Sequence, residues 1–228
     1  MAGPRGLPSV HARLYPAKSA GSLVSGSYEF TNDWFAINAP VWRNMIAETK
    51  PRRFLEIGTF EGQSALFMIE NCAAHGPLDL TCIDTWTGGV EHDRTTMADV
   101  EARFDRNIER ARAEHHQFTL RKMKADSTLA MAQLLAEGGA NSFDVTYVDA
   151  SHQAPDVLAD AILAFKLTRI GGILIFDDYL WQPEVRGKHD VLDAPKPGID
   201  AFVNTYLRKL NIVMGAPLRQ LYMAKTSD

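Results

Sequence analysis

The sequence predicts an α/β fold, in which helices cover both faces of a mostly parallel sheet, and two observations carry this prediction. After residue 52, short runs rich in branched and aromatic residues alternate with longer stretches of helical period, as in β-α-β units. Most of the short runs are nearly continuous in apolar residues, as expected of strands that are covered on both faces. These runs are residues 53–57, 80–84, 118–123, 143–149 and 172–177.

Four helices are expected between these strands, at residues 64–74, 97–113, 127–137 and 155–168. In the second, apolar residues recur every three or four positions from Val100 to Ala111, which gives the helix one apolar stripe. Pro155 suits a first helical turn, and the pair Gly171 and Gly172 is expected to separate the fourth helix from the next strand.

The two ends of the chain extend this pattern. Residues 34–49 predict an additional helix before the sheet, and residues 199–210 a final helix after it. Two short β candidates, 212–214 and 218–224, are expected to add an antiparallel pair at one edge, which brings the sheet to seven strands. We interpret residues 1–28, rich in Gly, Ser and Pro, as a flexible tail and residues 29–228 as one domain.

Composition limits the partners of the chain. With 228 residues, 46% of them hydrophobic, the chain can bury one substantial core. A formal net charge of -4 gives no basic surface for nucleic acid, and no apolar run approaches the roughly 20 residues of a membrane span. The two cysteines have no metal or redox spacing, which favours a cytoplasmic protein that binds small molecules. The first 28 residues, which contain basic residues and no acid, are also compatible with an organellar transit peptide.

A glycine-containing loop after the first strand is the first candidate binding element. Gly58 and Gly62 allow the backbone to turn sharply and a ligand to approach it, and Ser64 is expected to cap the next helix. The spacing is neither the full G-x-G-x-x-G dinucleotide pattern nor a phosphate-binding loop with its lysine. Glu56, at the start of this segment, favours a ligand with a cationic group over a pyrophosphate.

The end of the second strand supplies a second candidate. Asp84 lies at the depth expected of a carboxylate that accepts ribose hydroxyls, although a loop or cap carboxylate would look the same. Trp86 could stack on a base or on a substrate ring.

Three acids end the fourth and fifth strands: Asp149, Asp177 and Asp178. Neighbouring strands lie roughly 4.8 Å apart, so these carboxylates should converge. Like charges repel unless a cation or proton is shared, and an oxygen-only set suits Mg²⁺, Mn²⁺ or Ca²⁺. Asp177 and Asp178 would point to opposite faces of a regular strand, so both reach the site only if the chain is already turning.

Four strings, in this order, resemble class I S-adenosylmethionine-dependent methyltransferases of the small O-methyltransferase type: FLEIGTFEGQSA, TCIDTW, FDVTYVDASHQAPDVLADAILAF and GGILIFDDYLW. The resemblance covers roughly residues 34–210 and implies a Rossmann-like class I methyltransferase fold with S-adenosylmethionine as cofactor. Within the implied cofactor site, the glycine loop would hold the methionine moiety, the second strand the ribose, and residues 126–127 the adenine. The implied cofactor residues are Glu56, Gly58, Thr59, Phe60, Gly62, Ser64, Asp84, Thr85, Trp86, Asp126 and Ser127.

The resemblance also implies a metal-assisted reaction, because metal-dependent members carry acids at the positions of Asp149, Asp177 and Asp178. Catechol- and caffeoyl-type members have a lysine base three residues after the first acid, where this chain has His152. Similar Asp-x-x-His strings occur in enzymes that methylate sugar hydroxyls. We therefore expect His152, with Asp149, to remove a hydroxyl proton, although a histidine here could also cap the next helix.

The acceptor is expected to be a sugar, a catechol or another vicinal diol, in a pocket lined by Trp86, Tyr179 and Trp181. Three alternatives stay open: a metal-independent methyltransferase that uses Asp149 and His152, a nicotinamide-dependent oxidoreductase, and a cofactor-binding module without catalysis. Either the 34–49 helix or the C-terminal strands could form a homodimer.

Overall fold

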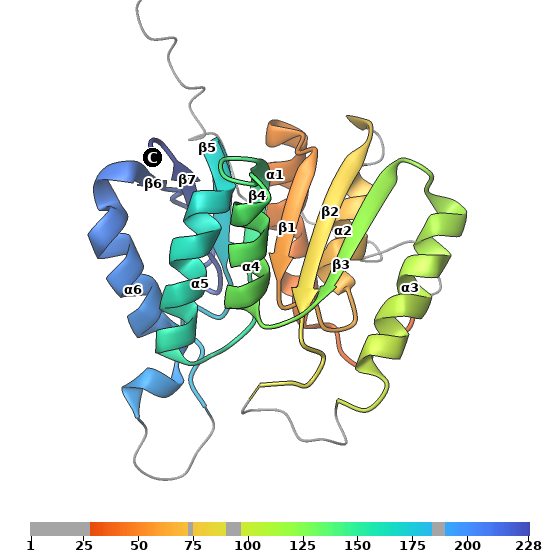
Figure 1. Ribbon diagram of the computed structural model, residues 1–228, viewed down its shortest axis with the longest axis horizontal. Coiled ribbons are helices and arrows are strands. Elements are labelled where there is room, and N and C mark those ends of the chain that lie inside the picture. The colour runs from red at the N-terminus through yellow and green to blue at the C-terminus, as the bar shows by residue number, and fades with distance from the viewer. Residues whose placement is uncertain (1–27, 73–74, 90–96, 184–189) are drawn as a thin grey trace, which may run out of the picture.

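A computed structural model describes residues 28–72, 75–89, 97–183 and 190–228, so the expected tail falls outside the described residues apart from Tyr28. It contains a seven-stranded sheet of order β3-β2-β1-β4-β5-β7-β6 (Figure 1). Five strands are parallel, and the last two in the chain form an antiparallel edge, which confirms the predicted fold class. The strands are β1 (Arg53–Ile57), β2 (Leu78–Asp84), β3 (Phe118–Lys124), β4 (Phe143–Val148), β5 (Thr168–Phe176), β6 (Leu210–Ile212) and β7 (Leu221–Lys225).

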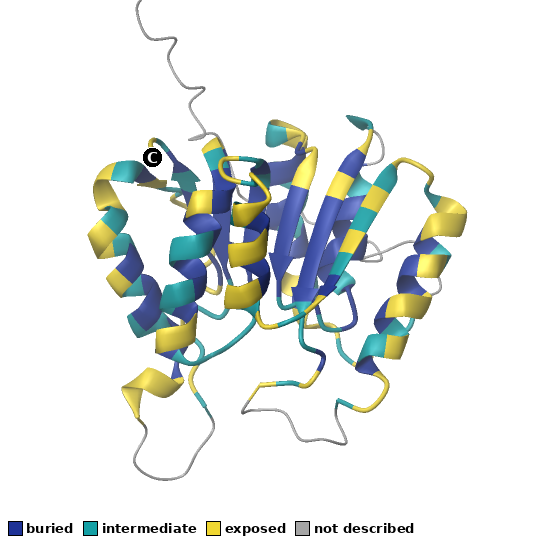
Figure 2. Cartoon of the chain, in the orientation of Figure 1, coloured by how far each residue is buried: buried dark blue, intermediate teal, exposed yellow. Residues whose placement is uncertain are grey.

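Two apolar cores separate the sheet from its helices. One core joins a face of the sheet to α1, α2 and α3, and the other joins the opposite face to α4, α5 and α6. Figure 2 shows the central strands buried between them. Among the described residues, no helix is long and apolar enough to cross a membrane. The helices are α1 (Ala39–Thr49), α2 (Gln63–Cys72), α3 (Val100–Glu114), α4 (Ser127–Ala136), α5 (Ala154–Leu167) and α6 (Pro195–Tyr206).

The N-terminal helix is shorter than predicted. A 3-10 turn, Trp34–Ile37, comes first, and α1 begins only after Asn38. A proline in the first turn of α1 accounts for the boundary, because proline lacks the N–H that would continue the preceding turn. The turn and the helix together pack the indole of Trp42 into the core, where it is completely buried.

The start of β5 differs most from the prediction. The strand begins at Thr168, and the glycine pair expected to precede it lies inside it. Pairing with β4 shifts from Phe143–Thr168 to Val145–Ile173, so extra residues of β5 bulge out of register. Gly171 has a φ of +79°, and a Cβ on Gly172 would lie 2.9 Å from a backbone oxygen of β4. The glycines therefore permit a bulge rather than a helix stop.

A buried carboxyl group lies on the inner face of α5. Asp160 is 1% exposed and accepts a hydrogen bond from the hydroxyl of Ser127 through Oδ1, at 2.7 Å. Among the described residues, its Oδ2 has no hydrogen-bond partner. Burial, with smaller contributions from the charges of Asp126 and Asp156, raises the pKa of Asp160 to about 7.

We predict that Asp160→Asn stabilises the protein more at pH 8 than at pH 5. The folded-state pKa lies above the ordinary value of 3.8, so folded protein holds a proton that unfolded protein releases between these values. The free energy of unfolding is therefore highest below pH 3.8 and falls as the pH rises from there through about 7. The total loss is on the order of 2–4 kcal/mol. The amide avoids this loss and can still accept from Ser127.

The measurement is urea unfolding of both proteins from pH 5 to pH 8. Glu109→Gln, which removes an exposed carboxylate from α3, is the control and should not change the pH profile. A stability difference between Asp160→Asn and the unsubstituted protein that is the same at every pH would contradict the prediction.

Candidate active site

A cavity of about 900 Å³ lies along the carboxyl edge of the parallel strands, at the lower edge of the sheet in Figure 1. Its volume is within the range of small-molecule sites. Most of the predicted site residues line it: Gly58, Thr59, Phe60, Ser64, Asp84, Thr85, Asp126, Ser127, Asp149, His152, Asp177, Asp178 and Trp181. Four do not: Glu56, Gly62, Trp86 and Tyr179.

Asp84 holds the glycine loop in place. One carboxylate oxygen accepts the backbone N–H groups of Thr59 and Phe60, at 2.9 and 2.8 Å, and the other accepts the N–H of Trp86 at 2.7 Å. Phe60 has a φ of +50°, a left-handed conformation that costs free energy in a residue with a side chain. The bonds from Asp84 offset this cost, so the loop is shaped before any ligand binds.

Gly58 is required where two loops nearly touch. It has a φ of +83°, and a Cβ at this position would lie 2.0 Å from the backbone oxygen of Asp149. The glycine loop after β1 and the loop after β4 can approach this closely only because residue 58 has no side chain.

Gly62 and Trp86 belong to the core rather than to the ligand surface, which corrects two predictions. A Cβ on Gly62 would lie 2.9 Å from the ring of Phe104. The indole of Trp86 is 6% exposed, packs 5.2 Å from the same ring, and donates from Nε1 to the carbonyl of Phe60 at 2.9 Å. Trp86 therefore supports the loop from behind and does not stack on a ligand.

Glu56 also lies beneath the loop, which corrects its predicted contact with a ligand cation. Its side chain is fully buried and accepts the hydroxyl of Thr59 at 2.5 Å and that of Ser64. Burial raises the pKa of Glu56 to about 7. Ser64, expected as a helix cap, instead joins α2 to β1 through this carboxyl group.

The residues expected at the adenine side begin α4. Asp126 accepts the N–H of Leu129 at 3.2 Å and caps the helix. Ser127 donates to Asp160. Both still line the cavity, so they form its wall at the end of β3.

The acids after β4 and β5 meet around one phenol. The hydroxyl of Tyr147 lies 2.8 Å from Asp149 and also within hydrogen-bond distance of Asp177. Asp177 accepts the side-chain amide of Gln220 at 2.9 Å and the N–H of Asp178 at 2.8 Å. Burial and mutual repulsion raise the pKa values of Asp149 and Asp177 above their usual range.

A different set of three side chains could hold a metal ion. Donor atoms of Asp149, His152 and Asp178 all lie within 4.8 Å of one another. Asp178 has a φ of +51°, so the chain turns after β5 and directs its carboxylate to His152, whose Nε2 lies 3.2 Å away. Asp177 lies outside this set and contacts Tyr147 and Gln220, so the set contains two of the three predicted aspartates, together with His152.

Of Trp181 and Tyr179, which were both expected in the acceptor pocket, only Trp181 lines the cavity. The indole of Trp181 lines the cavity, 4.2 Å from the ring of His152. Tyr179 does not line the cavity: its hydroxyl donates to Asp200 of α6 at 2.8 Å, and its half-buried ring packs against the core beneath that helix. His152 does not cap α5, whose N-cap residue is Gln153.

Two residues that no motif indicates come from the segment before β7. Arg219 lines the cavity and accepts the N–H of Tyr179 at its carbonyl, at 3.0 Å. Gln220 contacts Asp177 from behind the site. Only the pairing of β7 with β5 brings them there, and nothing in the local sequence signals that register.

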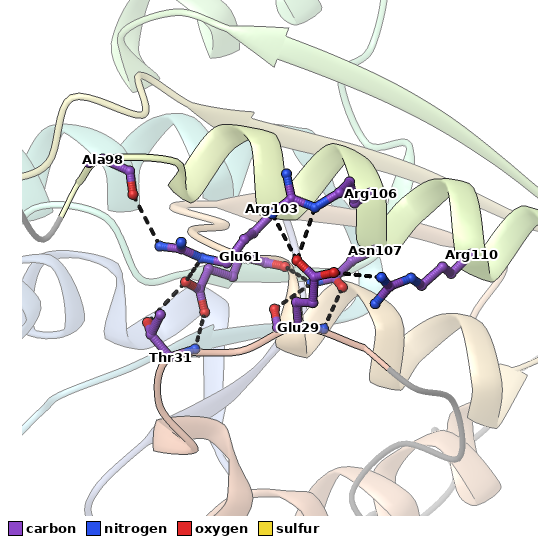
Figure 3. Close-up of polar contacts among 8 residues, drawn as sticks. All are labelled: Glu29, Thr31, Glu61, Ala98, Arg103, Arg106, Asn107 and Arg110. Carbon is purple, nitrogen blue, oxygen red and sulfur yellow. Dashed lines mark hydrogen bonds and ion pairs between the residues drawn. The ribbon is translucent and has the colours of Figure 1, made fainter.

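An N-terminal strap, residues 28–32, closes one side of the cavity and is fixed to α3 (Figure 3). Glu29 pairs with Arg106 at 2.8 Å and Arg110 at 2.5 Å. Glu61, in the glycine loop, accepts the N–H of Thr31 at 2.7 Å and pairs with Arg103 at 2.5 Å. Glu61 therefore joins three elements, a role that its position in the motif did not indicate.

Comparisons with known proteins show the family to which the chain belongs. A family model described as a methyltransferase domain matches residues 55–179, more than half of the chain. Mouse catechol O-methyltransferase domain-containing protein 1 is 30% identical over 148 residues, 64% of this chain and 49% of that protein. An uncharacterized protein of Acanthamoeba polyphaga mimivirus is 28% identical over 137 residues, 58% of this chain and 55% of that protein. The chain spans about half the length of these curated relatives.

Solved structures share the fold. The O-methyltransferase from Bacillus cereus in complex with SAH is 21% identical, with a TM-score of 0.55 over 81% of this chain and 78% of that one. The O-methyltransferase TomG from Streptomyces achromogenes, in complex with SAM, is 20% identical, with a TM-score of 0.52 over 81% and 78%. The family match disfavours the nicotinamide-dependent oxidoreductase that the sequence left open.

We predict that Gly58→Ala destabilises the protein far more than Gly138→Ala. Both glycines have nearly the same φ, +83° and +86°, but a Cβ at 138 has no atom within 4 Å. Gly138→Ala should cost about 1 kcal/mol in backbone strain alone. Gly58→Ala should cost at least about 2 kcal/mol more, because it also separates two loops. Urea unfolding measures both, and equal losses would contradict the clash.

We predict that Glu61→Gln costs about 1–3 kcal/mol of unfolding free energy, because Arg103 and the N–H of Thr31 lose a charged acceptor. The Glu61 side chain is 2% exposed, whereas that of Glu29 is 38% exposed. Glu29→Gln is the matched control, and its loss should be much smaller, since water screens exposed pairs. The same unfolding experiment tests this order, and a larger loss for Glu29→Gln would refute it.

Proposed function

Because the chain belongs to the methyltransferase-domain family that matches residues 55–179, we propose that it transfers a methyl group from S-adenosylmethionine to a hydroxyl of a small molecule. The observation that carries the proposal is the group formed by Asp149, His152 and Asp178 in the same cavity as the glycine loop. The loop supplies a binding surface, and the group supplies acids and a base where a hydroxyl could react.

The proposed cofactor side runs from the glycine loop to the start of α4. The SAH and SAM complexes of the two fold neighbours support this cofactor. Asp84 would accept a ribose hydroxyl through the oxygen that accepts the N–H of Trp86, because that oxygen keeps one lone pair, whereas the N–H groups of Thr59 and Phe60 occupy the other oxygen. Asp126 and Ser127 would lie beside the adenine, and the backbone at Gly58 would approach the methionine part.

The proposal further includes a divalent cation at the acidic group. Asp149 and Asp178 would hold it, since burial and repulsion among these acids favour a bound positive charge. Carboxylates suit Mg²⁺, Mn²⁺ or Ca²⁺. When bound, the cation would lower the pKa of a coordinated hydroxyl.

His152 would act as the general base. Its Nε2 would accept the hydroxyl proton as the new O–CH₃ bond forms and the S–CH₃ bond breaks, which leaves S-adenosylhomocysteine as the second product. Asp178, 3.2 Å from this nitrogen, would stabilise the imidazolium, and the indole of Trp181 would restrict the rotation of the ring. The second candidate is a metal-independent methyltransferase in which Asp149 and His152 act without a cation, and the approach of Asp178 to His152 would support it by stabilising the imidazolium.

We predict that chelator treatment abolishes methyl transfer to catechol and sugar diols and that Mg²⁺ or Mn²⁺ restores it. His152→Gln should lower kcat by about 10²- to 10⁴-fold, because the base is lost. Product formation is measured by mass spectrometry, and binding of S-adenosylhomocysteine by calorimetry. Binding should persist in both cases, because the proposed cofactor residues are intact.

His116→Gln, at an exposed position outside the cavity lining, is the matched control. Undiminished turnover after chelation would select the metal-independent candidate. Undiminished turnover of His152→Gln would remove this residue as the base, and failure to bind S-adenosylhomocysteine would refute the methyltransferase proposal itself.

A further inference from the structure

Negatively charged side chains outnumber positively charged ones among the described residues that line the cavity. Among the described residues, seven carboxylates line it, but only one guanidinium and no lysine. The carboxylates are Glu61, Asp84, Asp126, Asp149, Asp156, Asp177 and Asp178, and the guanidinium belongs to Arg219. A site of this composition would by itself repel an anionic ligand.

Each of these carboxylates already has a partner within the protein. Glu61 pairs with Arg103, Asp178 lies beside His152, and Asp156 accepts the hydroxyl of Ser151. Backbone N–H groups donate hydrogen bonds to Asp84 and Asp126. Tyr147 donates to Asp149, and Gln220 donates to Asp177. Because these partners, together with the proposed divalent cation, compensate the carboxylates, the small-molecule acceptor does not have to carry a cationic group.

Arg219 is the exception. In the part of the chain that the structure describes, no carboxylate lies within ion-pair distance of its guanidinium, although Asp177 and Asp178 are close in the fold. The last pair of the two strands is Phe176 with Leu221; beyond it the side chain of Gln220 bonds Asp177, and the carbonyl of Arg219 accepts the N–H of Tyr179, so Arg219 lies next to the acidic turn. Among the described residues of the lining, the one guanidinium is thus held beside the acidic group without forming an ion pair with it.

Arg219 also lies on the side of the acidic group that faces away from the glycine loop. The sheet order β1-β4-β5-β7 places the loop after β1 on one side of Asp149 and Asp178 and the segment before β7 on the other. A molecule that reaches these residues opposite the proposed cofactor would extend toward Arg219. Guanidinium binds planar anions in a bidentate manner, and carboxylates fit this geometry best.

We propose that the methyl acceptor is a hydroxy acid whose carboxylate binds Arg219 while its hydroxyl lies at Asp149, His152 and Asp178. This inference rests on the proposed methyl transfer and adds the chemical class of its substrate. Arg219 is a specificity-determining residue: it selects acids over neutral molecules of the same shape.

The test uses two matched pairs of probes, protocatechuate with its amide and glucuronate with its amide, as methyl acceptors. The unsubstituted protein should favour at least one acid over its amide by about tenfold or more in kcat/KM, the value of one charge-assisted hydrogen bond. Arg219→Gln should reduce this ratio by a similar factor. Arg208→Gln, which removes an exposed arginine outside the cavity lining, should keep the ratio.

Equal use of acids and amides, or an acid-to-amide ratio that Arg219→Gln does not change, would overturn the inference while leaving methyl transfer intact. If none of the four probes is methylated, calorimetry on the protein with S-adenosylhomocysteine distinguishes the two ideas. An acid that binds the unsubstituted protein and binds Arg219→Gln about tenfold more weakly supports the anion site without the proposed transfer. Absence of binding by both acids refutes the anion site.

Discussion

The contact between Gly58 and the backbone oxygen of Asp149 sets the dimensions of the whole site. A single added carbon would lie 2.0 Å from that oxygen, so the loops after β1 and β4 can lie at their present distance only if residue 58 has no side chain. The first loop belongs to the proposed cofactor side and the second to the acidic group. Because they touch, neither side can move without the other, and the distance between cofactor and acceptor becomes a property of the sheet.

Acids surround this contact at two depths, one fully buried and two half-buried. Glu56 lies in the layer beneath the glycine loop, where hydroxyl groups of Thr59 and Ser64 satisfy it, and it reaches no ligand. Asp149 and Asp177 lie at the cavity, where one phenol stands between them. Glu56 thus fixes the backbone of the loop. Asp149 and Asp177 repel each other, and a bound proton or cation would reduce this repulsion.

Much of the fold and part of the site could be predicted from the sequence. Apolar runs and helical periods located the parallel strands within a few residues, and acids at strand ends were placed together because parallel strands end at one edge. Side-chain direction was not predictable: Trp86 packs against Phe104 in the core, and Tyr179 bonds Asp200 of α6, so neither lines the cavity. Arg219 was missed because its position depends on the register of an antiparallel edge strand.

The side-chain amide of Gln220 gives the N-terminal helix a role beyond packing. Its oxygen accepts the indole N–H of Trp42 at 2.9 Å and the hydroxyl of Tyr222, so its nitrogen must face Asp177. An amide can rotate by half a turn and exchange donor for acceptor. The indole prevents this, because a rotated amide would set two donors against each other and an oxygen against a carboxylate. A tryptophan of α1 thus fixes the polarity of the group that supports Asp177.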